Sequence, residues 1–302
     1  MFFAIITALL FGVTPVFAAR SGRLLGPTLA NLARLLIAAL VLGLWSAYFH
    51  IIPYGSAAQW FILSGIVGLG IGGVSMFHSL TKLGPNLSNL TVQCGSVLAA
   101  SGVEFLWLGT RLTLPQSLSI ALAVVGIAIG LMPRCLPELR PTAWIQGIPW
   151  AVLSALAQGC GAVLSRKAFM VARLDAQTID AAGAGFERVL GGILIALLAV
   201  AISQMLISTR RAGSSPVLTP FARAWPWVLA NSFTGPILGV TCFQVALRSH
   251  PAGIVQAVVA IAPLLTIPMA AWIDGERPRR LYYLGVSLAV LAIATLWLLK
   301  AS

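Results

Sequence analysis

Apolar runs of about 20 residues recur along the whole chain, and this recurrence is what most constrains its fold. A helix needs about 20 mostly apolar residues to cross the hydrocarbon core of a bilayer. Leucine- and alanine-rich runs of this length favour helices over the short alternating strands of a membrane barrel. The sequence therefore predicts an all-α polytopic membrane protein without a separate soluble domain. Its ten expected transmembrane helices are residues 2–19, 28–49, 57–80, 86–108, 114–132, 146–165, 180–207, 225–247, 251–273 and 281–299.

Charge is scarce and confined mostly to the short stretches between these runs. Of the 302 residues 59% are hydrophobic and 9% are charged, and the net charge is +12. Because the basic residues stand one to three at a time between spans, they favour anchoring at the membrane surface over binding of nucleic acid. The cysteines show no CxxC spacing, so no disulfide or metal site is expected. They are Cys94, Cys135, Cys160 and Cys242.

The first span resembles a secretory signal peptide at its end. Val16, Phe17 and Ala18 imitate a small-residue cleavage site, but no Lys or Arg precedes Arg20. A signal peptide begins with a positively charged region, so we expect this segment to be a retained first span.

An internal repeat organises the chain. At one constant shift of 166 positions, "LWLGTRLTLP" (106–115) falls on "WIDGERPRRL" (272–281), and "GVSMF" (73–77) falls on "GVTCF" (239–243). Residues 1–133 and 146–300 are therefore predicted to be two copies of a five-helix unit. Because five is odd, the second copy must cross the membrane in the opposite sense. Inverted repeats of this kind form secondary transporters, whose substrate site lies near the midplane between the copies.

The charged stretch "DGERPRR" (274–280) is the predicted turn between the ninth and tenth spans. A "GER" after an apolar helix that contains Pro263 resembles the EamA-type unit of the drug/metabolite transporter superfamily. Phe11-Gly12 in the first span and Arg34 in the second also resemble that unit, although such proteins often carry Trp at the position of Phe11. The resemblance implies a ten-helix permease for small metabolites or drugs, with no catalytic centre and no cofactor.

Polar residues form one narrow stripe on the fourth span. They are Asn86, Asn89, Gln93, Ser96 and Glu104, and their spacing places them on one helical face. Their counterparts in the second copy are all apolar, so symmetric packing does not demand them. The stripe either faces a hydrated cavity or forms a hydrogen-bonded seam with a neighbouring helix. We favour the cavity.

Glu104 is the candidate for proton coupling. A carboxylate inside a transmembrane helix is a functional candidate by default, because it is costly to bury. Taking up and releasing a proton there would couple transport to a proton gradient. The alternatives are that Glu104 reaches the membrane interface or pairs with Arg111.

Further candidates stand at equivalent positions of the two copies. Phe77-His78 corresponds to Phe243-Gln244, which suggests hydrogen-bonding groups that bracket a substrate. Arg34, Glu187 and Arg188 are charges within spans, for which helix-end anchoring or an ion pair is favoured over a clamp for an anionic substrate. The predicted substrate-binding residues are Phe11, Thr14, Phe77, His78, Asn89, Gln93, Ser96, Gln158, Phe243, Gln244 and Gln256.

The expected function is secondary transport, most simply export, of small organic solutes across a bacterial inner membrane. The polarity of the predicted cavity favours neutral or zwitterionic solutes. An uncoupled uniporter or exchanger, an intramembrane lipid enzyme and a non-transporting subunit are the alternatives. The enzyme is disfavoured because no DxxxD, HExxH or GxSxG motif occurs, and no GxxxxGK[ST] loop indicates ATP hydrolysis. The expected partners are a small-molecule substrate and the lipid bilayer, with a homodimer left open.

The basic residues also bear on orientation. Eleven of those in turns fall on one face and six on the other, so the positive-inside rule predicts both termini outside. The family resemblance instead implies both termini in the cytoplasm. The larger set is Arg20, Arg23, Lys82, Arg134, Arg140, Arg210, Arg211, Arg223, Arg277, Arg279 and Arg280.

Overall fold

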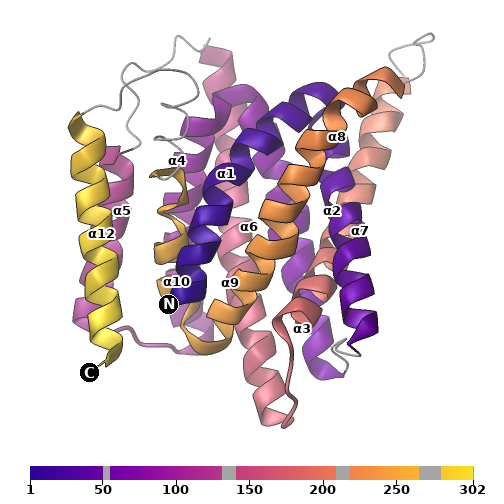
Figure 1. Cartoon of the computed structure of the whole chain (residues 1–302). Helices are drawn as coiled ribbons and strands as arrows, with labels where there is room; N and C mark the ends of the chain where they lie inside the picture. Colours follow the sequence, from indigo (N-terminus) through magenta and orange to yellow (C-terminus); the bar gives the residue numbers. More distant parts are fainter. Residues whose placement is uncertain (50–54, 131–140, 209–217, 265–279, 302) are drawn as a thin grey trace.

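A computed structural model describes residues 1–49, 55–130, 141–208, 218–264 and 280–301, and every regular element within these ranges is helical (Figure 1). The first copy comprises α1 (Phe2–Leu25), α2 (Pro27–Tyr48), α3 (Ser56–Gly65), η1 (Ile66–Ile71), α4 (Gly72–Leu108) and α5 (Leu114–Gly130). The second comprises α6 (Pro141–Leu174), α7 (Ala181–Ser208), α8 (Leu218–Ser232), η2 (Phe233–Ile237), α9 (Leu238–Ser249), α10 (Ala252–Val259) and α12 (Arg280–Ala301).

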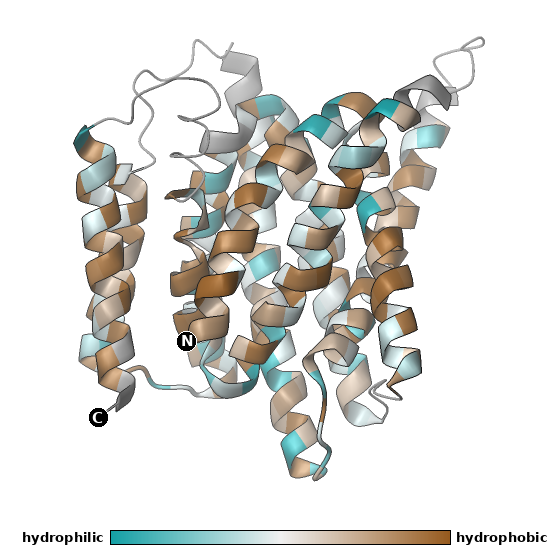
Figure 2. Cartoon of the chain, viewed as in Figure 1, coloured by the Kyte–Doolittle hydropathy of each residue, from teal (hydrophilic) through white to brown (hydrophobic). Residues whose placement is uncertain are grey.

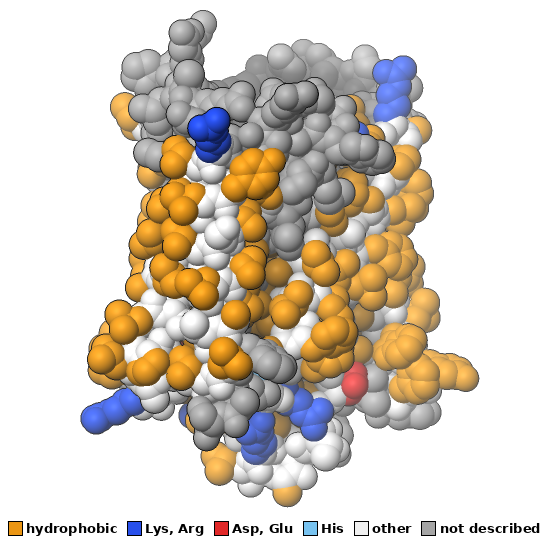
Figure 3. Space-filling model, turned by 60° about the vertical axis from the view of Figure 1, so that its left-hand side comes forward, with side chains coloured by type: hydrophobic (Ala, Val, Ile, Leu, Met, Phe, Trp, Pro, Cys, Tyr) orange, Lys and Arg blue, Asp and Glu red, His pale blue; other side chains and the backbone are white. Residues whose placement is uncertain are grey.

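These helices overlap all ten predicted spans, although residues 131–132 of the fifth and 265–273 of the ninth lie outside the described residues. Among the described residues, seven helical stretches have the length and apolar composition to cross a bilayer, and three shorter apolar helices accompany them. Brown, hydrophobic positions cover most of the helices in Figure 2, and Figure 3 shows a hydrophobic belt with Lys and Arg at both ends. The prediction of a polytopic helical membrane protein is confirmed.

Equivalent helices of the two copies run in opposite directions. In Figure 1, α1 rises from the N-terminus at the lower end of the molecule, whereas α6 descends from the upper end. The N- and C-termini consequently lie at the same end. This is the inverted arrangement that an odd number of spans in each copy requires.

Glycines with positive φ mark the turns between spans. Gly26 (φ 82°) separates α1 from α2, and Gly84 (φ 77°, ψ 169°) breaks α4 into the predicted third and fourth spans. Gly109 (φ 65°) ends α4 in the left-handed conformation. An L side chain is strained at such angles, so glycine allows these abrupt reversals. Of "DGERPRR", residues 274–279 lie outside the described residues and Arg280 begins α12.

Two π-helical segments, η1 and η2, occupy equivalent positions in the middle of the third and eighth spans. The third span there touches α7 backbone to backbone, because a Cβ added to Gly65 would lie 1.8 Å from the carbonyl oxygen of Arg188. Similarly, a Cβ on Gly191 would lie 2.0 Å from the carbonyl oxygen of Ile62. Small residues permit this close crossing, which joins the two copies beside the centre of the molecule.

Candidate functional site

A cavity lies at the centre of the bundle, between the two copies. The space in it that no atom occupies amounts to about 860 Å³, a figure that includes the part open to solvent. Helices α1, α2, α4, α6, α7, α9 and α10 and both π-helical segments contribute to its wall. Of the residues predicted to bind substrate, eight line it: Phe11, Thr14, Phe77, Asn89, Gln93, Gln158, Phe243 and Gln256.

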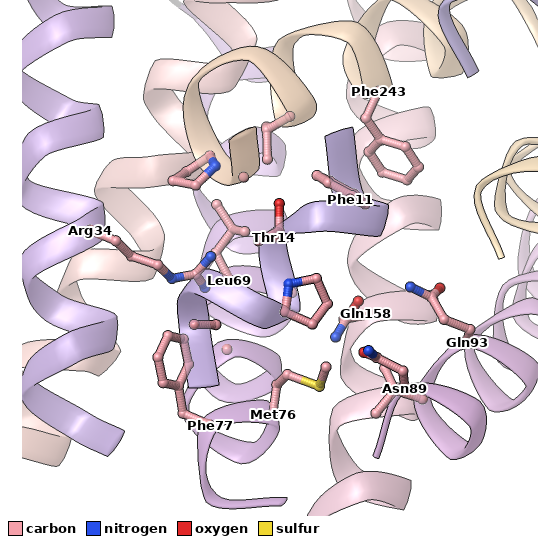
Figure 4. A pocket seen from close by; sticks show the side chains of 18 of the residues that line it. Phe11, Thr14, Arg34, Leu69, Met76, Phe77, Asn89, Gln93, Gln158 and Phe243 are labelled. Atoms are coloured by element: carbon pink, nitrogen blue, oxygen red, sulfur yellow. The ribbon is translucent and has the colours of Figure 1, made fainter. Parts of the chain in front are cut away.

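One side of the cavity carries carboxamide groups. Figure 4 shows Asn89, Gln93 and Gln158 gathered on the side opposite Arg34. The Nε2 of Gln158 donates a hydrogen bond to Ser154 Oγ at 3.0 Å. Asn89 is 3% exposed and its Oδ1 has no hydrogen-bond partner. A buried acceptor without a partner is costly, so a ligand or a water molecule that reaches it would satisfy it.

Not every member of the predicted stripe reaches the cavity. Asn89 and Gln93 line it, whereas Ser96 is buried elsewhere and donates to the carbonyl of Gln93 at 3.0 Å. Glu104 is also absent from the cavity wall, and the side chain of Asn86 lies outside what the structure describes. The stripe therefore contributes two amides to the cavity through the part of α4 that follows the break at Gly84.

Two arginines border the cavity, each beside a phenylalanine. The guanidinium carbon of Arg34 lies 5.2 Å from the ring centre of Phe77, and that of Arg188 lies 5.4 Å from the ring centre of Phe243. The two phenylalanines are related by the repeat shift, and each arginine is the eighth residue of its helix, α2 or α7. The inverted repeat thus builds the same cation–π pair twice, once in each copy.

The buried positions of both arginines do not fit helix-end anchoring, one of the roles favoured from the sequence. Each arginine lies about two turns inside its helix and is buried, with Arg34 9% and Arg188 4% exposed. Within the described ranges the recorded salt bridge involves neither of them. Glu187 is buried next to Arg188 but does not line the cavity. The sequence placed all three within spans but could not show which way each side chain turns.

His78 and Gln244 follow the two phenylalanines and do not line the cavity. The ring of His78 stacks on Trp150 with 4.9 Å between centroids, and its Nδ1 lies 2.9 Å from the carbonyl oxygen of Val74. Gln244 is fully buried, and its Oε1 accepts a long hydrogen bond of 3.5 Å from Arg188 Nη1. Successive helical residues are about 100° apart, so the residue that follows a cavity-lining phenylalanine need not share its face.

Glu104 lies near the end of the molecule that holds the termini. It is 2% exposed, and its Oε2 accepts a hydrogen bond from the backbone N–H of Gly253 at 3.0 Å. Its Oε1 lies 4.0 Å from Nε of Arg166, and Nη1 of the same arginine donates to the carbonyl of Leu247 at 2.9 Å. Glu104 therefore neither reaches the interface nor pairs with Arg111. It joins α4 to α6 and α10 beside the cavity rather than in it.

Sequence reasoning missed several residues of the cavity wall. Leu69, Met76 and Val240 line it, and Asn31 holds Arg34 by accepting from its Nε and Nη2 at 2.9 and 2.8 Å. Asn31 stands three residues before Arg34, a spacing that places both on one helical face and was the available signal. The apolar residues carried no signal, because they are indistinguishable from lipid-facing or core residues. In the described part of the chain, no three His, Cys, Asp or Glu side chains gather as a metal site.

Comparison with known proteins agrees with this architecture. The sequence pattern of the EamA-like transporter family matches twice, over residues 1–132 and 145–298. The chain belongs to the EamA-like transporter family. This confirms the resemblance noted from the sequence and makes the chain a membrane protein of a family of transporters.

A solved structure shares the fold. Its title reads only "Crystal structure of protein"; it matches with a TM-score of 0.73 and 17% identity, covering 99% of this chain and 96% of that chain. At this identity the likeness establishes the fold alone. No curated protein matches the sequence.

Proposed function

We propose that this family member is a secondary transporter that exports small organic solutes by alternating access, in the inner membrane of a bacterium. The observation that carries the proposal is the central cavity, whose wall comes from both inverted copies. A site between inverted repeats can be exposed to either side of a membrane by rocking one copy against the other. Carboxamides, arginines and aromatic rings at the wall supply the contacts for a small polar solute.

Rocking requires contacts that break at one end of the cavity. Near the termini, Glu104, Arg166 and the backbone of Leu247 and Gly253 join helices α4, α6, α9 and α10. These few polar contacts would separate when the cavity opens on that side. The irregular segments η1 and η2, and the break at Gly84, supply positions where the third, fourth and eighth spans can bend.

Flux through purified protein tests the proposal. Proteoliposomes are loaded with a ¹³C-labelled metabolite extract, and the solutes they lose are identified by mass spectrometry. We expect protein-dependent loss of specific solutes, and a strong reduction by Met76→Trp, which places a large ring in the cavity. Leu98→Trp is the matched control, because Leu98 also belongs to α4, beyond the break at Gly84, but is 62% exposed on the outer surface. Absence of flux for every solute would instead favour a non-transporting membrane subunit.

We further propose that transport is coupled to protons through Glu104. The alternative is uncoupled exchange of solutes. Burial of the Glu104 carboxylate supports coupling. Its position outside the cavity wall supports the alternative. Glu104→Gln retains an acceptor for the Gly253 N–H but cannot take up a proton at neutral pH. If a pH gradient drives flux in the wild type and no longer does so in this variant, coupling through Glu104 holds; equal dependence on the gradient in both excludes it.

A further inference from the structure

We propose that the solute carried is a small organic anion, bound by the guanidinium groups of Arg34 and Arg188. The inference rests on the proposed transport function and specifies its substrate class. It departs from the neutral or zwitterionic solutes expected from the sequence, because only the structure shows that both arginines border one cavity.

The cavity has an uncompensated positive charge. Arg34 and Arg188 both line it, and among the described residues no Asp or Glu side chain lines it. Among the described residues the recorded salt bridge joins Arg166 to Glu104, away from both. Burying a charge without a counter-charge is costly, so a bound anion would stabilise this arrangement. A zwitterion would bring an ammonium group, for which the described part of the wall offers no carboxylate.

Several hydrogen-bond donors of both guanidinium groups are not used by acceptors of the described residues. A guanidinium has five N–H donors, and Arg34 uses its Nε and Nη2 on Asn31. Figure 4 shows the Arg34 side chain extending from α2 toward the cavity. Arg188 has one long bond of 3.5 Å to Gln244, and its Nε has no hydrogen-bond partner although the residue is 4% exposed. Carboxylates and phosphates match such a fork of donors.

Each guanidinium lies close to the opposite copy as well as to its own phenylalanine. A Cβ added to Gly68 in η1 would lie 2.7 Å from Arg188 Nη2, and one on Gly235 in η2 would lie 3.4 Å from Arg34 Nη1. The glycines thus leave room for arginines that cross the boundary between copies. Because α2 and α7 begin at opposite ends of the bundle, one arginine lies nearer each membrane face (Figure 1). A positive charge therefore meets the solute whichever side is open.

The other polar residues of the wall indicate which further groups the solute carries. Asn89, Gln93 and Gln158 lie across the cavity from Arg34 in Figure 4 and offer both donors and acceptors. This pairing of charge with amides fits an organic acid that also carries hydroxyl or amide groups. The acidic group is a carboxylate or a phosphate ester, which the two arginines bind by the same chemistry.

Fractionation of the labelled extract tests the inference. An anion-exchange resin separates solutes with net negative charge from neutral, cationic and zwitterionic ones, and proteoliposomes containing the full chain are loaded with each fraction. We expect flux from the retained fraction only. Treating that fraction with alkaline phosphatase distinguishes the two acids, because flux of a phosphate ester disappears and flux of a carboxylate persists.

Variants connect the flux to the arginines. Arg34→Gln and Arg188→Gln should each reduce flux of the anion by about tenfold or more, the effect expected for losing a charged hydrogen-bonding partner. Arg111→Gln is the matched control, because Arg111 is exposed in the turn after α4, and it should transport as the wild type does. Arg34→Lys and Arg188→Lys preserve the charge and should recover part of the flux, which a loss of folding alone would not allow.

The outcomes separate the two proposals. Flux confined to the unretained fraction, or unaltered anion flux in both glutamine variants, overturns the anion inference and leaves transport standing. Equal loss of flux in the lysine and glutamine variants alike would show a purely structural role of the arginines and would also overturn the anion inference. No protein-dependent flux in either fraction overturns the transport function itself.

Discussion

Replacing Gly65 by alanine tests the close crossing of the third span on α7. The added Cβ would lie 1.8 Å from the carbonyl oxygen of Arg188 and 2.6 Å from its carbonyl carbon, whereas ordinary contact begins near 3.4 Å. The two backbones must therefore separate by about 1.6 Å. The obstructing atoms are backbone, so no side-chain rotation relieves the clash. Because the same stretch of α7 carries Arg188, the separation would also displace one wall of the cavity.

The expected magnitude follows from two opposing effects. Overpacking of this kind costs about 1–3 kcal/mol or more, while alanine in a helix is favoured over glycine by about 1 kcal/mol. We expect a net loss of stability and a lower Tm, by roughly 2–4 °C for each kcal/mol lost. Thermal unfolding of the detergent-solubilised protein, followed by size-exclusion chromatography, measures this.

Gly102→Ala is the internal control. Gly102 lies within α4, and a Cβ there would meet nothing within 4 Å. This variant should gain the helical preference of alanine without a clash and unfold at the same temperature as the wild type or slightly above it. Equal Tm values for the two variants would refute the backbone contact at Gly65.

Three further predictions concern other contacts. Glu104→Ala should destabilise the folded protein by about 1–3 kcal/mol, because the buried N–H of Gly253 loses its acceptor. Glu104→Gln should retain most of that stability, and equal shifts of Tm in the two variants would contradict the hydrogen bond. Gly84→Ala should cost about 1–3 kcal/mol through backbone strain alone, since φ is 77° and a Cβ meets nothing within 4 Å; an unchanged Tm would show that the turn can relax. A fluorescent protein fused after Ser302 should stay dark if the C-terminus lies outside, as the positive-inside rule predicts, because such a protein folds poorly outside the cytoplasm. Bright fusions would favour the cytoplasmic termini that the family resemblance implies.

Much of the site could be anticipated from the sequence because polar residues are rare in these spans. Asn89, Gln93 and Gln158 stood out for that reason, and all three line the cavity. Ser96 and Glu104 shared the stripe with the first two but lie elsewhere, since one helical face continues beyond the length of the cavity. Periodicity assigns a residue to a face, whereas the cavity occupies only part of that face.

The sequence by itself determined the class of protein, its spans and its duplication. Hydrocarbon admits no unpaired backbone groups, so apolar length alone selects transmembrane helices, and a five-span repeat must be inverted. Tertiary structure decided what the charged residues do. Whether Arg34 and Arg188 anchor helix ends or meet at one cavity depends on the rotation and close crossing of helices far apart in the chain. That geometry arises from glycine contacts between the copies, which no local pattern specifies.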